Sequence, residues 1–202
     1  MLGRMKRLQR GDTIVEVLFA TTIFSMVAVG GLSIMNQGTA MAQRALEIGL
    51  VRQQIDAQAD ALRYMSQAYI ADYGGSGLAT QRWNNVIFNN QVSEAVPFDS
   101  IVSDGKCTLP TSDKQPFAVN INELSTPDPQ LALSNEPATY SKLNYEAPIP
   151  TAEGIWVQAV RSPVAPGQTG FYDFHIRACW ESPGQTAPMT IGTIVRLYEP
   201  RN

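Results

Sequence analysis

The feature that most constrains this 202-residue chain is an apolar run from Ile14 to Met35, in which Glu16 is the only ionisable side chain. A helix rises about 1.5 Å per residue, so a run of this length can cross a hydrocarbon layer about 30 Å thick. The residues ahead of it include four cations and no acid before Asp12: Arg4, Lys6, Arg7 and Arg10. Because positive flanks stay in the cytoplasm, we predict a single-pass protein whose chain after Met35 lies outside the cell membrane.

Glu16 is the residue in this run that needs an explanation. An ionised carboxylate at membrane depth costs a few kcal/mol unless a cation pairs with it. One explanation is a carboxyl that is protonated or that reaches the membrane interface. The other is a specific partner for the carboxylate, and the residues that precede Glu16 favour it.

A basic leader, Gly11, a short gap, Glu16 and a long apolar helix follow one another in this chain. This combination resembles the class III signal of type IV prepilins and type II secretion pseudopilins. The resemblance implies that a membrane prepilin peptidase cuts after Gly11, so that Glu16 becomes the fifth residue of the mature chain. It also implies N-methylation of the new N-terminus by the same peptidase. Asp12 stands where the family usually has Phe, which leaves methylation open and cleavage expected.

The resemblance further implies a structural role rather than a catalytic one. We expect a subunit of a type IV pilus-like filament, held in the cell membrane first and then assembled into an extracellular filament through its N-terminal helix. Glu16 would meet the amino group of a neighbouring subunit. The implied partners are other pilin subunits, the prepilin peptidase and an inner-membrane assembly platform. Asp12 and the long head favour a minor pilin or pseudopilin over a major subunit, and adhesion, secretion and DNA uptake all stay open.

Two other interpretations of the N-terminus remain. A cleaved secretory signal is disfavoured because the apolar run is long and no convincing small-x-small site closes it. A signal-anchored protein would keep residues 1–11, and its extracytoplasmic domain would bind a ligand or catalyse a reaction. In that case Glu16 would need no partner.

Charge and cysteine content narrow the classes of function. The net charge is −3, and removal of residues 1–11 would make it −7. An acidic outer domain without a cluster of Lys or Arg does not predict nucleic-acid binding. Cys107 and Cys179 both lie in the outer part, where we expect a disulfide, with two buried free thiols as the alternative.

The chain divides into four segments by pattern. Residues 1–11 form the leader, residues 12–35 the membrane or filament-core helix, residues 36–73 an amphipathic continuation and residues 74–202 the head domain. The amphipathic stripe comprises Ile48, Val51, Ile55, Ala59, Leu62, Met65 and Tyr69. The intervening polar positions comprise Glu47, Arg52, Gln53, Gln54, Asp56, Gln58 and Asp60. We expect the stripe to pack against the head.

The head domain shows its clearest pattern near the C-terminus. Residues 155–161, 171–181 and 189–198 read as three strands of an antiparallel meander. Residues 117–121 alternate and predict a further strand, whereas residues 122–150 are rich in Pro, Ser, Thr and Asn and predict loops. The expected fold class is α+β, with a long N-terminal helix packed on an antiparallel sheet. This plan also agrees with the pilin resemblance.

No group of residues in the sequence predicts an active site, a metal site or a cofactor. His175 is the only histidine, and we interpret it as a strand residue of the polar face rather than a catalytic base. Asp99, Asp104 and Asp113 lack the spacing of a calcium loop. Residues 74–77 are glycine-rich, but no Lys follows them and no strand precedes them, so they do not predict a phosphate-binding loop.

Overall fold

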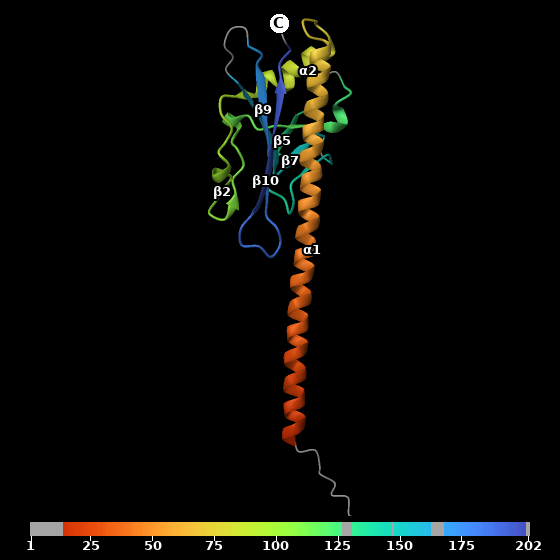
Figure 1. The fold of residues 1–202 in the computed structure, drawn as a ribbon, viewed down its shortest axis with the longest axis vertical. Coiled ribbons are helices and arrows are strands. Elements are labelled where there is room, and N and C mark those ends of the chain that lie inside the picture. The colour runs from red at the N-terminus through yellow and green to blue at the C-terminus, as the bar shows by residue number, and fades with distance from the viewer. Residues whose placement is uncertain (1–13, 127–130, 147, 163–167, 201–202) are drawn as a thin grey trace, which may run out of the picture. The chain divides into compact units, whose positions relative to one another are not determined.

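A computed structural model describes residues 14–126, 131–146, 148–162 and 168–200 (Figure 1). The described chain is α+β, as predicted. It divides into two compact units, residues 1–43 and 44–202. The helix α1 (Ile14–Ala71) contributes to both units, and the strands belong to the second.

Helix α1 is a single helix of 58 residues. The apolar segment and the amphipathic segment that the sequence predicts are therefore continuous, and Gly30, Gly31 and Gly38 do not interrupt the helix. The helix ends at Ala71, two residues before the predicted boundary at residue 73. Gly74 then adopts a left-handed conformation with φ +79, which a glycine takes without the steric cost of a side chain.

The buried stripe of α1 follows the predicted periodicity but contains two residues that the sequence analysis placed on the polar side. Val51, Leu62 and Met65 are buried as expected. Glu47 and Gln58 are also buried, which corrects the prediction. Both occur at helical spacing from the apolar members, so their positions in the stripe follow from geometry rather than from hydrophobicity.

The first sheet contains the predicted meander. Its order is β1-β8-β9-β10, with β8 antiparallel to β9 and β9 antiparallel to β10. The strands are β1 (Gln91–Val92), β8 (Ile155–Arg161), β9 (Phe171–Trp180) and β10 (Met189–Tyr198). The second predicted strand ends at Trp180, one residue early. The sheet is mixed rather than antiparallel, because β1 pairs with β8 in parallel.

A second sheet corrects the prediction that residues 122–150 form loops. Its order is β4-β5-β7-β6, and β5 pairs with β7 in parallel. The strands are β4 (Ala118–Val119), β5 (Leu131–Asn135), β6 (Lys142–Asn144) and β7 (Thr151–Glu153). The strand predicted over residues 117–121 is reduced to β4, because residue 121 begins a 3₁₀ turn and residue 117 forms a bridge to β8.

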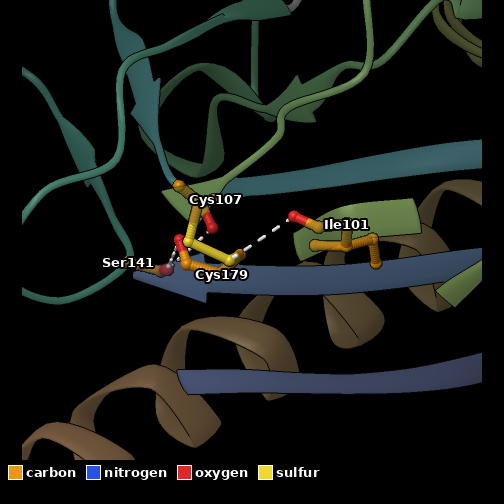
Figure 2. Close-up of a disulfide and its surroundings, with 5 residues drawn as sticks. Ile101, Cys107, Ser141 and Cys179 are labelled. Atoms are coloured by element: carbon orange, nitrogen blue, oxygen red, sulfur yellow. Dashed lines mark hydrogen bonds between the residues drawn. A yellow bond between two sulfur atoms is a disulfide. The ribbon is translucent and has the colours of Figure 1, made fainter. Parts of the chain in front are cut away.

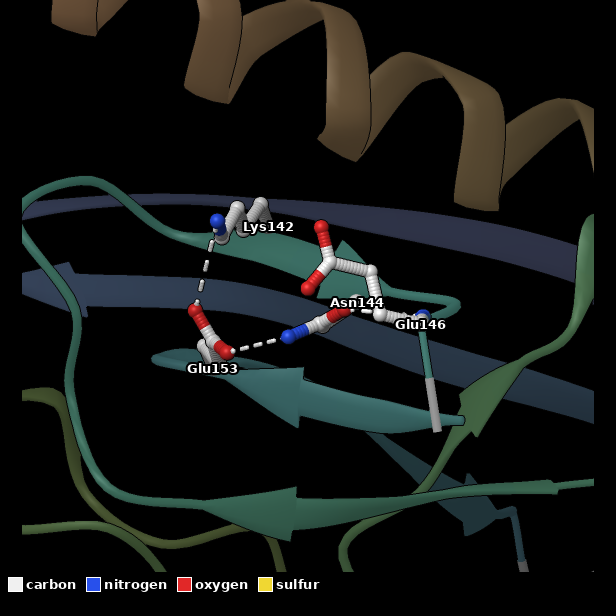
Figure 3. A network of polar contacts seen from close by, with 4 residues as sticks. All are labelled: Lys142, Asn144, Glu146 and Glu153. Carbon is white, nitrogen blue, oxygen red and sulfur yellow. Dashed lines mark hydrogen bonds and ion pairs between the residues drawn. The ribbon is translucent and has the colours of Figure 1, made fainter. Parts of the chain in front are cut away.

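Polar pairs hold the surface of this second sheet together. Glu153 on β7 accepts a hydrogen bond from Asn144 Nδ2 at 3.0 Å and lies 3.7 Å from Lys142 Nζ (Figure 3). Asn144 in turn accepts a hydrogen bond from the backbone of Glu146. These opposite-charge and amide pairs are cross-strand neighbours of the kind that stabilise a sheet.

The two faces of the first sheet are covered differently. One face packs against α1 and carries the main core, including Phe174, Ile176 and Trp180. The other face is covered in part by residues 96–110, which we call the flap. The flap contains β2 (Val102–Ser103) and β3 (Lys106–Cys107), and Ile101 packs there against Trp156 and Cys179.

The connection after α1 leads into the helix α2 (Leu78–Val86). Its close packing accounts for the glycines at residues 74–77. The Asp72 carboxylate accepts hydrogen bonds from the backbone and the hydroxyl of Thr80, in the first turn of α2. A Cβ at Gly75 would lie 2.6 Å from Asp72 Oδ1, so this loop wraps closely around a carboxylate of the chain itself. The remaining short 3₁₀ turns are Phe88–Asn90, Phe98–Ile101, Ser112–Lys114 and Ile121–Glu123.

Candidate functional site

The predicted processing and assembly site lies at the start of α1. Gly11 and Asp12 are outside the described residues. Glu16 occupies the first turn of α1 with its side chain exposed, and it has no hydrogen-bond or ion-pair partner within the described part of the chain. An acid in the first helical turn is favourably placed relative to the helix dipole.

The rest of this stretch presents an apolar surface that nothing in the described chain covers. The large apolar residues from Ile14 to Met35 are at least half exposed, and Met26 reaches 81%. Soluble proteins rarely leave a continuous apolar surface of this extent open. The helix is long and apolar enough to cross a membrane, so it can act as a single span or signal anchor.

Three hydroxyl side chains in this stretch are satisfied within the helix. The hydroxyls of Thr21, Thr22 and Ser25 donate to backbone carbonyls three or four residues earlier. Such local bonds let hydroxyl groups remain in an apolar environment without a partner from another element. Of the polar side chains between Ile14 and Met35, Glu16 and Ser33 have no hydrogen-bond partner within the described chain, and Glu16 is the one that is ionisable.

Cys107 and Cys179 form the expected disulfide, with their Cα atoms 5.8 Å apart and a sequence separation of 72. It joins β3 in the flap to β9 in the first sheet (Figure 2). The Ser141 hydroxyl donates to the carbonyls of Gly154 and Cys179. It therefore holds Gly154, the residue before β8, next to the disulfide. The disulfide thus fixes the flap on the outer face of the sheet.

His175 lies in β9 on that outer face, as its alternation predicts, and is half-buried. The Arg177 guanidinium donates to His175 Nδ1 at 3.3 Å, so Nδ1 must accept. Burial, together with the neighbouring Arg177, lowers the pKa of His175, and Asp173 opposes this effect. Within the described chain no serine, threonine or cysteine side chain is hydrogen-bonded to His175, so the arrangement is not that of an activated nucleophile.

The acidic residues of the middle segment do not come together. Asp113 accepts a hydrogen bond from Thr111, which lowers the pKa of Asp113. Among the described residues, no three His, Cys, Asp or Glu side chains are grouped as a metal site would require. Asp99 and Asp104 lie in different turns of the flap.

Two buried glutamines of structural importance were missed by the sequence analysis. Gln58 Nε2 donates to the Val119 carbonyl at 2.9 Å, and Gln58 Oε1 accepts from the Val119 amide at 2.8 Å. Gln158 in β8 binds the Val96 amide and the Lys114 carbonyl in the same manner. The signal for Gln58 is its position within the 3-and-4 spacing of the stripe. No comparable signal exists for Gln158, because nothing in the sequence pattern of β8 indicates that a glutamine at this position is buried.

Comparison with known proteins does not assign this chain to a family. No family model, no curated protein and no solved structure matches the chain.

The single histidine makes one pH dependence readily testable. Since the folded-state pKa of His175 is lowered, the unfolded chain binds more protons below about pH 6.5, and stability falls as pH falls through that window. We expect denaturant midpoints of the full chain in detergent to decrease from pH 7.0 to pH 5.5. The H175Q variant should lose this dependence. Equal slopes for the two proteins would contradict the assignment.

Proposed function

We propose that this chain is a pilin-like structural subunit, a minor pilin or pseudopilin, that is cut after Gly11 and assembled into a filament through α1. The observation that carries the proposal is the combination of a basic leader, Gly11 and Glu16 as the one ionisable side chain of the exposed apolar stretch from Ile14 to Met35. An α+β head with a long N-terminal helix is compatible with this role.

The physical logic of assembly follows from Glu16. Cleavage would create a positive amino group on Asp12, and a carboxylate in an apolar filament core needs a cation of this kind. Pairing with the amino group of a neighbouring subunit would satisfy both charges in one axial register. In any other register Glu16 would be unpaired among apolar side chains. The energetic cost of that arrangement would favour the register in which Glu16 is paired.

The partners follow from the same scheme. Copies of this chain or related pilins would contact the apolar surface of α1, and a membrane peptidase would recognise the region around Gly11. An inner-membrane platform would extract the subunit from the bilayer. The head, from residue 74 onward, would decorate the filament surface.

Processing is tested by the N-terminal mass of the protein isolated from its native membranes or from sheared surface material. We expect a chain that begins at Asp12, with or without an added methyl group. A chain that begins at Met1 in cells possessing the peptidase would overturn the proposal. It would leave a signal-anchored protein with an extracytoplasmic domain.

Assembly is tested by the E16A variant. We expect normal membrane insertion and normal cleavage, but loss of most of the protein from the sheared filament fraction, because the register contact is gone. S25A is the matched control, since the Ser25 hydroxyl bonds only to the Thr21 carbonyl in the described chain. Normal recovery of E16A in filaments would contradict the role of Glu16.

A further inference from the structure

The two cysteines of the disulfide differ in their exposure to solvent. Cys179 in β9 is fully buried, whereas Cys107 in β3 is partly exposed. The sequence contains no further cysteine, so no other thiol of the chain competes with these two. A thiol from outside that exchanges with this disulfide therefore meets two sulfur atoms in unequal surroundings.

Cys179 is enclosed by its own sheet and by the flap. It is paired with Thr190 of β10, and its amide donates to the Gly154 carbonyl at the start of β8. On the outer face, Ile101 of the flap and Trp156 of β8 pack against it. Because Cys179 has no exposed surface, a thiolate could reach its sulfur atom only after the flap had moved.

A cavity of about 400 Å³ lies beside Cys107. The flap contributes Cys107 and Pro110 to its lining, and the end of β5 and the residues that follow contribute Asn135, Glu136 and Pro137. Asn135 and Glu136 are exposed, so the cavity opens to solvent. A space of this size is large enough for a small organic molecule. A small thiol can therefore approach Cys107 while the flap stays in place.

The geometry of thiol–disulfide exchange favours the same sulfur atom. The attacking thiolate approaches one sulfur in line with the S–S bond, from the side opposite the sulfur that leaves, and the reaction depends on access to that side. The Ile101 carbonyl oxygen lies 4.0 Å from Cys179 Sγ, on the side away from Cys107 (Figure 2). Ile101 therefore obstructs the approach to Cys179, and the approach to Cys107 lies outside this packing.

The position of Cys179 also suits the sulfur atom that leaves. Once the S–S bond is broken, a Cys179 thiol can donate a weak hydrogen bond to the Ile101 carbonyl at the same 4.0 Å. Buried thiols in apolar surroundings are chemically inert compared with exposed ones. The freed thiol can thus remain where the disulfide sulfur was, and the chain around Cys107 is the part that is released.

We propose that Cys107 is a site of reversible modification by small thiols, with Cys179 as the buried leaving thiol. A thiolate attacks Cys107 Sγ and forms a new S–S bond to it while the bond between the two cysteines breaks. The electron pair of the broken bond goes to Cys179 Sγ, which takes up the proton that the small thiol lost. The product carries the small thiol on the flap, and the reverse reaction restores the cross-link. This modification goes beyond the proposed role in a filament and does not depend on it.

The test maps the adduct on the oxidised full chain in detergent. The chain is exposed briefly to glutathione, remaining thiols are blocked with N-ethylmaleimide, and trypsin separates the two cysteines into residues 107–114 and 178–196. By mass spectrometry, we expect at least about ten times as much glutathione on Cys107 as on Cys179, with the maleimide on Cys179. In concentrated urea, where the fold is lost, we expect comparable amounts on both.

The route through the cavity is tested by the N135W variant, with N135A as the matched control. The indole at this exposed position should cover the cavity and slow adduct formation about tenfold, and alanine should leave the rate unchanged. Circular dichroism checks the folding of both variants.

Four results would overturn the proposal. They are no adduct on the folded chain, as much adduct on Cys179 as on Cys107, the same bias towards Cys107 in urea as in the folded chain, and a folded N135W variant that reacts as fast as the wild type.

Discussion

Removal of the disulfide, with both Cys107 and Cys179 replaced by alanine, is expected to lower the free energy of unfolding of the unit formed by residues 44–202 by about 4 kcal/mol. The cross-link joins residues 72 apart, and closing a loop of this length restricts the unfolded chain by roughly that amount. The closed loop includes the whole second sheet and β8. The measurement is urea unfolding of the full chain in detergent.

The flap should respond most strongly to this change. Apart from the disulfide, Gln158 and Arg177 attach the flap to the sheet through the backbone of Val96. Without the cross-link, residues 98–110 depend on packing alone, chiefly that of Ile101 against Trp156 and of Phe98 against Arg177. We therefore expect trypsin to cleave after Lys106 much faster in the double variant.

Reduction of the wild-type disulfide is the control. It distinguishes the effect of breaking the covalent cross-link from the effect of removing the two sulfur atoms and their packing contacts. Reduced thiols keep most of the contacts beside Ile101 and Trp156 but release the loop. Reduction should therefore reproduce most of the lost stability and the faster cleavage. A reduced chain as stable and as resistant as the oxidised one would show that the disulfide contributes little.

The features that sequence alone predicts are those encoded by local periodicity. The apolar run from Ile14 to Met35 and the last three strands extend over seven or more residues, so their patterns are clear. The proposed processing signal would also be local, because a peptidase would recognise a short linear segment around Gly11. Pairing of Cys107 with Cys179 could be expected from their number and location, but the fold was needed to place them together.

The features that sequence alone misses depend on tertiary contacts. Strands β5, β6 and β7 have three to five residues each and lie among prolines, which leaves too little alternation to recognise. Arg177 alternates onto the outer face and so suggests a solvated cation. The flap buries Arg177 through Val96 and Phe98, and the Cys107–Cys179 disulfide holds the flap on the same strand.

Substitution of Gln58 by methionine is expected to destabilise the unit formed by residues 44–202 by about 2–4 kcal/mol, although the change makes the core more apolar. Gln58 is fully buried, and its amide forms both hydrogen bonds available at the outward side of Val119. Methionine has a similar length but cannot replace them. The Val119 amide and carbonyl would then stay buried without partners, at about 1–3 kcal/mol each, partly offset by better apolar packing.

The measurement is the urea midpoint of the full chain in detergent, with Q53M as the matched control. Gln53 is exposed on the opposite side of the same helix, so the identical substitution there should change stability by no more than about 0.5 kcal/mol. If Q58M were as stable as the wild type or more stable, apolar packing would outweigh the two hydrogen bonds. The side chain would then not be needed to close the edge of β4. A large loss of stability in Q58M alone would mean that α1, through the side-chain amide of Gln58, supplies the hydrogen bonds that a neighbouring strand would otherwise give to the outward side of β4.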